Sequence, residues 1–303
     1  MNPFFSVIIP TYNQDVFLQK AIQSVLDQTF KKFEIIVVDN FSQDNTENIV
    51  KNFDKKFIKY IKIDNNGVIA KSRNVGIRES KGRWVAFLDS DDKWFPERLM
   101  ILHDFIEKNN FYEIICTDEY IIDKVRDIKR IWRYGPYKKD FYKFLLKYGN
   151  CISTSATIAN KKFIFNNNIY FNESEEFAPQ EDYDFFLNLA RKNAKFKFLH
   201  KILGEHLFHK ESWGERIKDK RKKSLIAVIK NHIYKVQNFT DKKSSLWSFA
   251  YSRLIIDDIR DLFYSGELLK ALSLSIKLFI NYPVKSVFHF SYKLRKKFFT
   301  SIL

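Results

Sequence analysis

An apolar run that ends abruptly in acidic residues occupies positions 84–92, Trp-Val-Ala-Phe-Leu-Asp-Ser-Asp-Asp. Five consecutive apolar residues predict a buried strand, and the carboxylates predict a charged loop at its carboxyl end. Carboxylates this close together repel one another unless a cation neutralises them. Magnesium is suited to this role, since it usually takes one or two protein carboxylates and completes its shell with water and substrate phosphates. A solvated acidic turn is the alternative for this stretch taken alone.

Strands and helices alternate over the first hundred residues. The apolar runs are residues 5–10, 33–38, 58–63 and 84–88, and helical periodicity separates them. This alternation predicts a parallel α/β sheet, whose ligands bind beyond the carboxyl ends of the strands. We therefore expect Tyr12, Asp39 and residues 89–92 to meet in one crevice, and the first strand to end at Pro10, which cannot donate to a sheet ladder. Neither GxGxxG nor GxxxxGK[ST] occurs, so a metal would have to carry the charge of a bound phosphate.

Composition narrows the class of protein. The chain of 303 residues is 45% hydrophobic with eight glycines and six prolines, which argues against disordered and fibrous classes. Two cysteines, Cys116 and Cys151, are too few for a disulfide framework and fit a reducing compartment. We find no secretory signal at the N-terminus, and no apolar run of about 18 residues predicts a spanning helix.

The net charge of +16 is concentrated in the last third, where residues 201–303 hold 21 Lys/Arg against 9 Asp/Glu. A basic tail of this kind meets nucleic acid or an anionic membrane surface. Residues 287–302 combine aromatic and aliphatic side chains with basic ones and contain no acidic residue. This pattern favours an interfacial helix over a spanning one, and a helix packed on its own domain is the alternative.

Four sequence words carry a family resemblance. They are SVIIPTYN at 6–13, VVDNFSQDNT at 37–46, SRNVG at 72–76 and FLDSDDKWFPERL at 87–99. In this order, residues 5–98 resemble the nucleotide-binding half of a family 2 glycosyltransferase with the GT-A fold. Asn40 and Phe41 depart from the family pattern, in which Asp and Gly are frequent at these positions.

The resemblance implies a role for each matching residue. Tyr12 would lie against a uracil face, and Asp39 would accept a hydrogen bond from the uracil ring N–H. Arg73 would line the site near the nucleotide. Asp89 and Asp91 match the DxD motif, with Asp89 near the ribose and Asp91 on a metal that bridges the diphosphate. The other nucleotide-binding residues that it implies are Pro10 and Ser90.

Two further words extend the resemblance to about residue 215. The pair Glu181-Asp182 matches the ED motif, in which Asp182 would be the general base of an inverting transferase. A cap at a helix N-terminus is the alternative, and such a position would help to keep the carboxylate ionised. His209 and Ser212 match an HxxS word whose His approaches the diphosphate or metal, whereas we interpret His206 as structural. The remaining site candidates are Glu181, Asp92, Trp94 and Ser212.

The sequence thus predicts an α/β, GT-A nucleotide-diphospho-sugar transferase at residues 1–215, with a mostly parallel sheet flanked by helices, followed by a basic helical region at 216–303. We expect an inverting glycosyltransferase that uses Mn²⁺ or Mg²⁺ to move a sugar from a nucleoside diphosphate, UDP by the resemblance, to a glycan or lipid-linked hydroxyl. We expect it in the cytoplasm, peripheral on an anionic membrane face, with no nucleic-acid partner. A noncatalytic nucleotide-sugar scaffold of the same fold and a basic nucleic-acid-binding protein are the alternatives.

Overall fold

The computed structural model describes residues 2–209 and 218–301. The chain divides into two compact units, one of residues 1–137 and 151–225 and the other of residues 138–150 and 226–303. The sequence analysis grouped residues 138–150 with the first domain, whereas the structure groups them with the C-terminal helices. The first unit holds the sheet and every candidate site residue that the structure describes.

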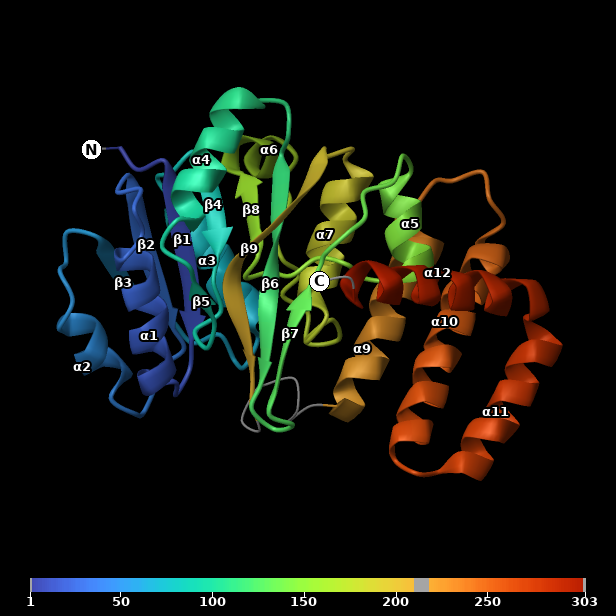
Figure 1. Ribbon diagram of the computed structural model, residues 1–303. Helices are drawn as coiled ribbons and strands as arrows, with labels where there is room; N and C mark the ends of the chain where they lie inside the picture. The colour runs from blue at the N-terminus through green and yellow to red at the C-terminus, as the bar shows by residue number, and fades with distance from the viewer. Residues whose placement is uncertain (1, 210–217, 302–303) are drawn as a thin grey trace. The chain divides into compact units, whose positions relative to one another are not determined.

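A nine-stranded mixed sheet forms the core of the first unit (Figure 1), in the order β3-β2-β1-β4-β8-β6-β9-β5, with β7 added to β6. Its strands are β1 (Phe5–Thr11), β2 (Phe33–Asp39), β3 (Ile58–Lys62), β4 (Trp84–Phe87), β5 (Lys93–Trp94), β6 (Ile114–Asp123), β7 (Ile128–Trp132), β8 (Thr157–Asn160) and β9 (Phe196–Phe208). The four strands predicted from the first hundred residues are confirmed and pair in parallel. Strand β8 then runs antiparallel to both β4 and β6, so the second half of the sheet is mixed.

The parallel register aligns the ends of the first strands. Thr11 lies opposite Asp39, and Ile8 lies opposite Phe87 two residues before Asp89. Strand β1 continues through Pro10 to Thr11, one residue beyond the predicted end. This is possible because β4 pairs with β1 only as far as Ile8, so on that side Pro10 is not required to donate to a ladder.

Helices cover both faces of the sheet. In the first unit they are α1 (Asp15–Leu26), α2 (Thr46–Lys51), α3 (Ile69–Glu79), α4 (Arg98–Lys108), α6 (Lys161–Asn166) and α7 (Glu181–Arg191). Helix α1 packs Leu18 and Ile22 into the same cluster as Val7 and Ile9. Helix α3 approaches the opposite face so closely that a Cβ at Gly76 would lie 2.3 Å from Cγ2 of Ile8. The glycine of the SRNVG word thus allows helix-to-strand contact.

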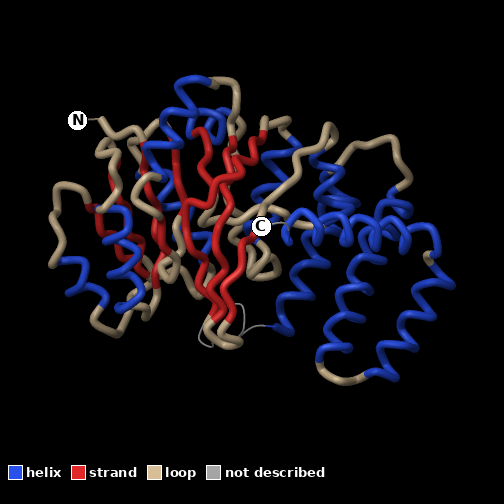
Figure 2. The backbone as a smooth tube through the Cα atoms, viewed as in Figure 1, coloured by secondary structure: helices blue, strands red, loops and turns tan. Residues whose placement is uncertain are grey.

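The second unit is helical. It contains α5 (Phe141–Tyr148), the last six residues of α9 (Lys218–Asn231, which begins in the first unit), the short helix His232–Val236, α10 (Lys243–Tyr264), α11 (Leu268–Asn281) and α12 (Pro283–Ser301) (Figure 2). Helix α5 is amphipathic and buries its apolar side chains, and its Tyr142 hydroxyl lies 2.9 Å from Nδ1 of His232. Among the described helices, none is both long and apolar enough to cross a membrane.

Candidate active site

Asp39 ends β2 with a fully buried side chain. Its carboxylate accepts hydrogen bonds from the hydroxyl of Tyr60, at 2.6 Å, and from the backbone N–H and hydroxyl of Ser42. Burial and the Asp39 carboxylate raise the pKa of the Tyr60 hydroxyl, so Tyr60 remains a donor at neutral pH. Three donors therefore fix the acceptor that the resemblance assigns to the base.

The loops after β1 and β2 are joined beside Asp39. Ser42 Oγ accepts from the backbone of Asn13, and Asn13 Oδ1 accepts from the backbone of Gln43. Tyr12 is 53% exposed on this joined loop, so its ring is free to meet a ligand. Phe41 has a φ of +51°, in the left-handed region where glycine is favoured. This backbone conformation explains why glycine is frequent there in the family pattern.

Arg73, on α3, is an ionic bridge within the site. Its guanidinium lies 2.7 Å from a carboxylate oxygen of Asp89 and 2.9 Å from one of Glu181, and the residue is only 4% exposed. Burial lowers the pKa of Arg73, but Asp89 and Glu181 more than offset that effect and leave its pKa raised. Arg73 therefore joins the DxD segment to the ED pair, two segments that are far apart in the sequence.

The ED pair opens α7, as the sequence predicts. Glu181 is buried against Arg73, and one of its oxygens has no hydrogen-bond partner among the described residues. Burial raises the pKa of Asp182, although Arg73 and Arg221 oppose the rise. Burial thus acts against the tendency of a helix N-terminus to keep Asp182 ionised. A carboxylate with a raised pKa is a stronger base.

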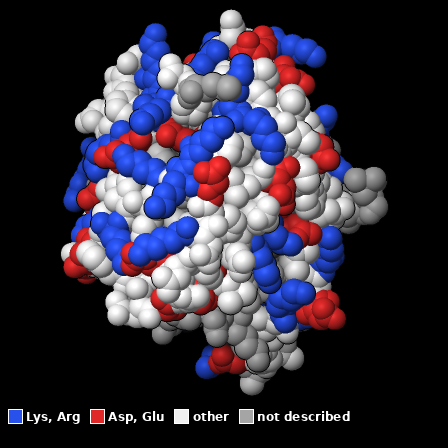
Figure 3. Space-filling model, turned by 90° about the vertical axis from the view of Figure 1, so that its left-hand side faces the viewer, with Lys and Arg blue, Asp and Glu red and all other residues white. Residues whose placement is uncertain are grey.

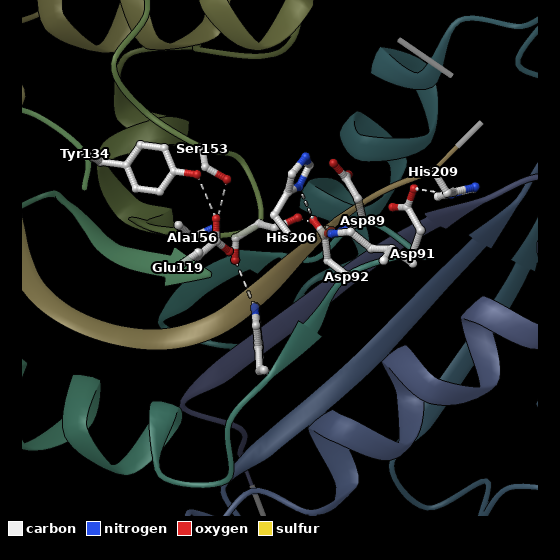
Figure 4. Close-up of polar contacts among 12 residues, drawn as sticks. Asp89, Asp91, Asp92, Glu119, Tyr134, Ser153, Ala156, His206 and His209 are labelled. Atoms are coloured by element: carbon white, nitrogen blue, oxygen red, sulfur yellow. Dashed lines mark hydrogen bonds and ion pairs between the residues drawn. The ribbon is translucent and has the colours of Figure 1, made fainter. Parts of the chain in front are cut away.

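Asp91 and His209 lie together at one end of the DxD loop (Figure 4). Nε2 of His209 is 3.2 Å from a carboxylate oxygen of Asp91, and the imidazole stacks on Phe17 with ring centroids 4.6 Å apart. The described residues contain no cluster of three or more His, Cys, Asp or Glu side chains that could hold a metal. One carboxylate and one imidazole nevertheless fit a divalent ion whose other positions are filled by substrate phosphates and water.

Asp92 points away from Asp91 into the protein. It is buried, accepts from the backbone N–H of Leu207 at 2.9 Å and lies 3.0 Å from Nδ1 of His206 (Figure 4). The Asp92 carboxylate raises the pKa of His206 to about 10. This ion pair ties the DxD loop to β9, the strand that leads into His209.

A second buried polar cluster lies behind this pair, and the sequence analysis missed it. Glu119, on β6, is fully buried and accepts from the hydroxyls of Tyr134, at 2.9 Å, and Ser153 (Figure 4). Arg98 is also fully buried, and burial lowers its pKa to about 10 while Glu119 opposes the change. Glu119 lies on the part of β6 that pairs antiparallel with β7, opposite Trp132.

Other predicted site residues have packing positions. Trp94 is buried and donates from its indole to the carbonyl of Ser155, whose hydroxyl accepts from the backbone of Asp89. Ser90 is buried and hydrogen-bonds Gln14, and Pro10 lies inside β1. Ser212 lies outside the described residues.

A cleft of about 530 Å³ adjoins Asp91. Its walls come from α1, β5, β9 and the β6–β7 hairpin, and four lysines line it, namely Lys20, Lys93, Lys124 and Lys129. Glu205 forms ion pairs with Lys93 and Lys129. Asp91, Asp123 and Asp127 also line the cleft, so its charged side chains are of both signs.

On the face drawn in Figure 3, lysines and arginines are interspersed with aspartates and glutamates. The described residues on that face thus form no single-sign stripe of the kind that a nucleic-acid backbone binds.

The mixed α/β sheet with acidic residues at its strand ends, together with a match to a family model, identifies a glycosyltransferase of the GT-A fold. Residues 6–167 match Glycosyl transferase family 2, and the chain belongs to that family.

Several characterised and uncharacterised proteins are similar to this chain. An uncharacterised glycosyltransferase of Methanocaldococcus jannaschii is 27% identical over 259 residues, covering 84% of this chain and 87% of that protein. The Escherichia coli UDP-Glc:alpha-D-GlcNAc-diphosphoundecaprenol beta-1,3-glucosyltransferase WfgD is 30% identical over 194 residues, 62% of this chain and 70% of WfgD. A Rickettsia felis glycosyltransferase is 32% identical over 190 residues, 62% of this chain, which spans only 30% of that protein's length.

Solved structures share the fold. S. aureus TarS 1–349 in complex with UDP-GlcNAc superposes with a TM-score of 0.64 at 22% identity, covering 90% of this chain and 79% of that one. The mannosyltransferase PcManGT from Pyrobaculum calidifontis, in complex with GDP-Man and Mn²⁺, gives a TM-score of 0.57 at 14% identity, covering 95% and 84%.

Proposed function

We propose that this glycosyltransferase moves a sugar from a nucleoside diphosphate, UDP in particular, to a hydroxyl of a glycan or lipid-linked acceptor with inversion at the anomeric carbon. The observation that carries the proposal is the Arg73 bridge, which holds the DxD segment and the ED pair in one site. Donor-side and base-side residues are thereby fixed relative to each other before any substrate binds.

The base supports a single displacement. Asp182 is the second carboxylate of the ED pair, and its raised pKa makes it a better proton acceptor than an exposed aspartate. It would take the proton of the acceptor hydroxyl as that oxygen attacks the anomeric carbon. The bond to the diphosphate breaks on the opposite face, so one attack with one base inverts the configuration.

Asp39 and Tyr12 support a nucleotide-sugar donor whose base is uracil. Asp39 is fixed by Tyr60 and Ser42 with its carboxylate at the end of β2, and an exposed ring at Tyr12 offers a stacking surface. WfgD, a relative at 30% identity, is named as a UDP-Glc transferase, which agrees with this assignment. Asp89 would lie near the ribose.

Asp91 and His209 would hold a divalent cation, Mn²⁺ or Mg²⁺. Such a cation supplies Lewis-acid stabilisation of the departing diphosphate when it is bound. The residues' own contribution is position: the Asp92–His206 pair fixes the loop that carries Asp91, and Phe17 fixes the imidazole of His209.

The acceptor would be reached at a membrane surface. The excess of basic residues after position 200 would bring the enzyme to an anionic surface where lipid-linked acceptors are found. WfgD is named for a diphosphoundecaprenol-linked acceptor, and this supports a lipid-linked substrate class here.

A panel of nucleotide sugars with Mn²⁺ tests the function through release of nucleoside diphosphate. We expect one UDP-sugar to be turned over by the wild type, and we expect Asp182→Asn to bind that donor without accelerating transfer. A protein that binds UDP-sugars but turns over none, with lipid-linked and glycan acceptors present, would instead be a noncatalytic scaffold.

A further inference from the structure

Helix α11 exposes an unusually continuous apolar face. Six large apolar side chains on it are between 49% and 84% exposed, namely Leu268, Leu269, Leu272, Ile276, Phe279 and Ile280. At about 100° per residue they fall within an arc of about 120°. No charged residue lies within that arc. We call these six residues the α11 face.

The exposure does not come from a detached helix. Ala271 and Leu278, on the opposite side of α11, are buried, and α11 packs within the second unit. Phe279 also stacks on Phe290 of α12 with ring centroids 6.1 Å apart. Val284 and Val287 of α12 are more than 60% exposed and extend the same apolar surface. A soluble monomer rarely exposes so many neighbouring large apolar groups without a partner.

The basic residues of the C-terminal helices indicate an anionic partner for the α11 face. Residues 268–303 contain seven lysines and arginines and no acidic residue. Lys270 and Lys277 lie on α11 about 60–80° beyond the edge of the apolar arc, by the same helical geometry. The charged side chains of α11 are both lysines, and one of them, Lys270, also forms an ion pair with Glu267. An apolar arc on a helix whose charged residues are basic is the pattern of a helix that lies in the plane of an anionic lipid surface. In a symmetric pair of chains, by contrast, these like charges would face one another and repel.

We propose that α11 is the element that docks on an anionic membrane, with the α11 face inserted among the acyl chains and its lysines at the headgroups. This proposal rests on the proposed function, because the α11 face would bring the enzyme to the membrane that holds a lipid-linked acceptor. Fourteen residues of helix extend about 21 Å, and lying flat requires no span.

The docking helix proposed here is α11, whereas the sequence predicts an interfacial helix at residues 287–302. In the structure, the first part of α12 packs against α10. His289 and Ser286 are buried, and Nε2 of His289 lies 2.9 Å from the carbonyl oxygen of Phe249. Helix α11 instead turns its largest apolar side chains outward.

Vesicle cosedimentation of the full chain tests the proposal. Leu269→Ser/Ile276→Ser removes two aliphatic side chains that are 84% and 53% exposed, so the fold should persist, as circular dichroism would verify. Met100→Ser/Val125→Ser is the matched control, since it removes two exposed apolar side chains from the first unit. With phosphatidylglycerol-containing vesicles, we expect the partition coefficient to fall by at least about tenfold for the α11 variant and to change less than about twofold for the control.

A second arm tests the charge. Lys270→Gln/Lys277→Gln should weaken binding to anionic vesicles at low salt and leave the weak binding to pure phosphatidylcholine vesicles unchanged. Equal partitioning of the wild type and the α11 variant would overturn the proposal. A wild-type dimer in light scattering that Leu269→Ser/Ile276→Ser converts to a monomer, without a change in lipid binding, would also overturn it by assigning the α11 face to a second copy.

Donor turnover without lipid separates this proposal from the proposed function. If the wild type binds vesicles through α11 but turns over no nucleotide sugar, the proposed function fails and the docking surface stands. If turnover is intact in both proteins and vesicle binding is equal, only the docking surface fails.

Discussion

Replacing Arg73 with methionine tests whether the site is held by one buried cation. Methionine keeps most of the volume of the side chain and leaves Glu181, whose side chain is 5% exposed, without a counter-charge. Removing one partner of a buried ion pair typically costs about 3–5 kcal/mol. The bond to Asp89 adds less than about 1 kcal/mol, because that carboxylate is 28% exposed and solvent screens it.

Protonation of Glu181 sets an upper limit to this loss. A buried carboxylate cannot cost more than the free energy needed to protonate it, about 1.4 kcal/mol for each pH unit above about 4.3, the pKa of an unfolded glutamate. The limit is about 1 kcal/mol at pH 5 and about 5 kcal/mol at pH 8. Burial already raises the pKa of Glu181 in the wild type, so the measured differences should lie below these limits. The loss caused by Arg73→Met should therefore grow as the pH rises from 5 to 8.

Urea unfolding followed by tryptophan fluorescence measures this loss, since Trp84, Trp94 and Trp132 all lie in the first unit. The double variant Arg73→Met/Glu181→Gln should be more stable at pH 8 than the sum of the single effects. The same loss at pH 5 and pH 8, together with additive single effects, would refute the buried bridge.

Three other perturbations follow from the same contacts. Asp182→Asn should lower turnover by about 10²–10⁴ with donor affinity unchanged, and equal losses in binding and turnover would make Asp182 a structural cap. The acid limb of the wild-type pH–rate profile should lie above the ordinary aspartate pKa, because burial raises the pKa of Asp182 and only its ionised form is a base. Asp91→Ala should abolish transfer with the melting temperature nearly unchanged, and EDTA should have the same effect on the wild type; full activity in excess EDTA would contradict the metal assignment. Gly76→Val should destabilise the first unit by about 1–3 kcal/mol in urea unfolding, because its side chain would meet Ile8, and Ile8→Ala should recover part of that loss.

The first half of the sheet could be predicted from the sequence because its signals are local. Apolar runs of strand length, helical periodicity between them and the acidic stop after Leu88 each depend on neighbouring residues. The same locality placed the start of α7 at Glu181. Even the misplaced end of β1 at Pro10 had a tertiary cause, since β4 stops pairing two residues earlier.

The contacts that organise the site could not be predicted, because they join distant segments. Arg73 and Glu181 are 108 positions apart, and Asp92 and His206 are 114 apart. No local pattern distinguishes Glu119, a buried acceptor, from a solvated hairpin carboxylate. The pKa of Asp182 depends on burial by the folded chain, which overrides the helix end that the sequence does reveal.

The anomeric configuration of the first-formed product tests the single displacement by Asp182 most directly. With the donor identified from the panel, a proton NMR time course would follow the anomeric signal as the sugar is transferred. An α-linked donor should give a β-linked product from the earliest spectra, and Asp182→Asn should slow its formation without changing its configuration. An α-linked product that forms first would contradict the mechanism, because retention requires either a second displacement or attack from the face of the departing diphosphate.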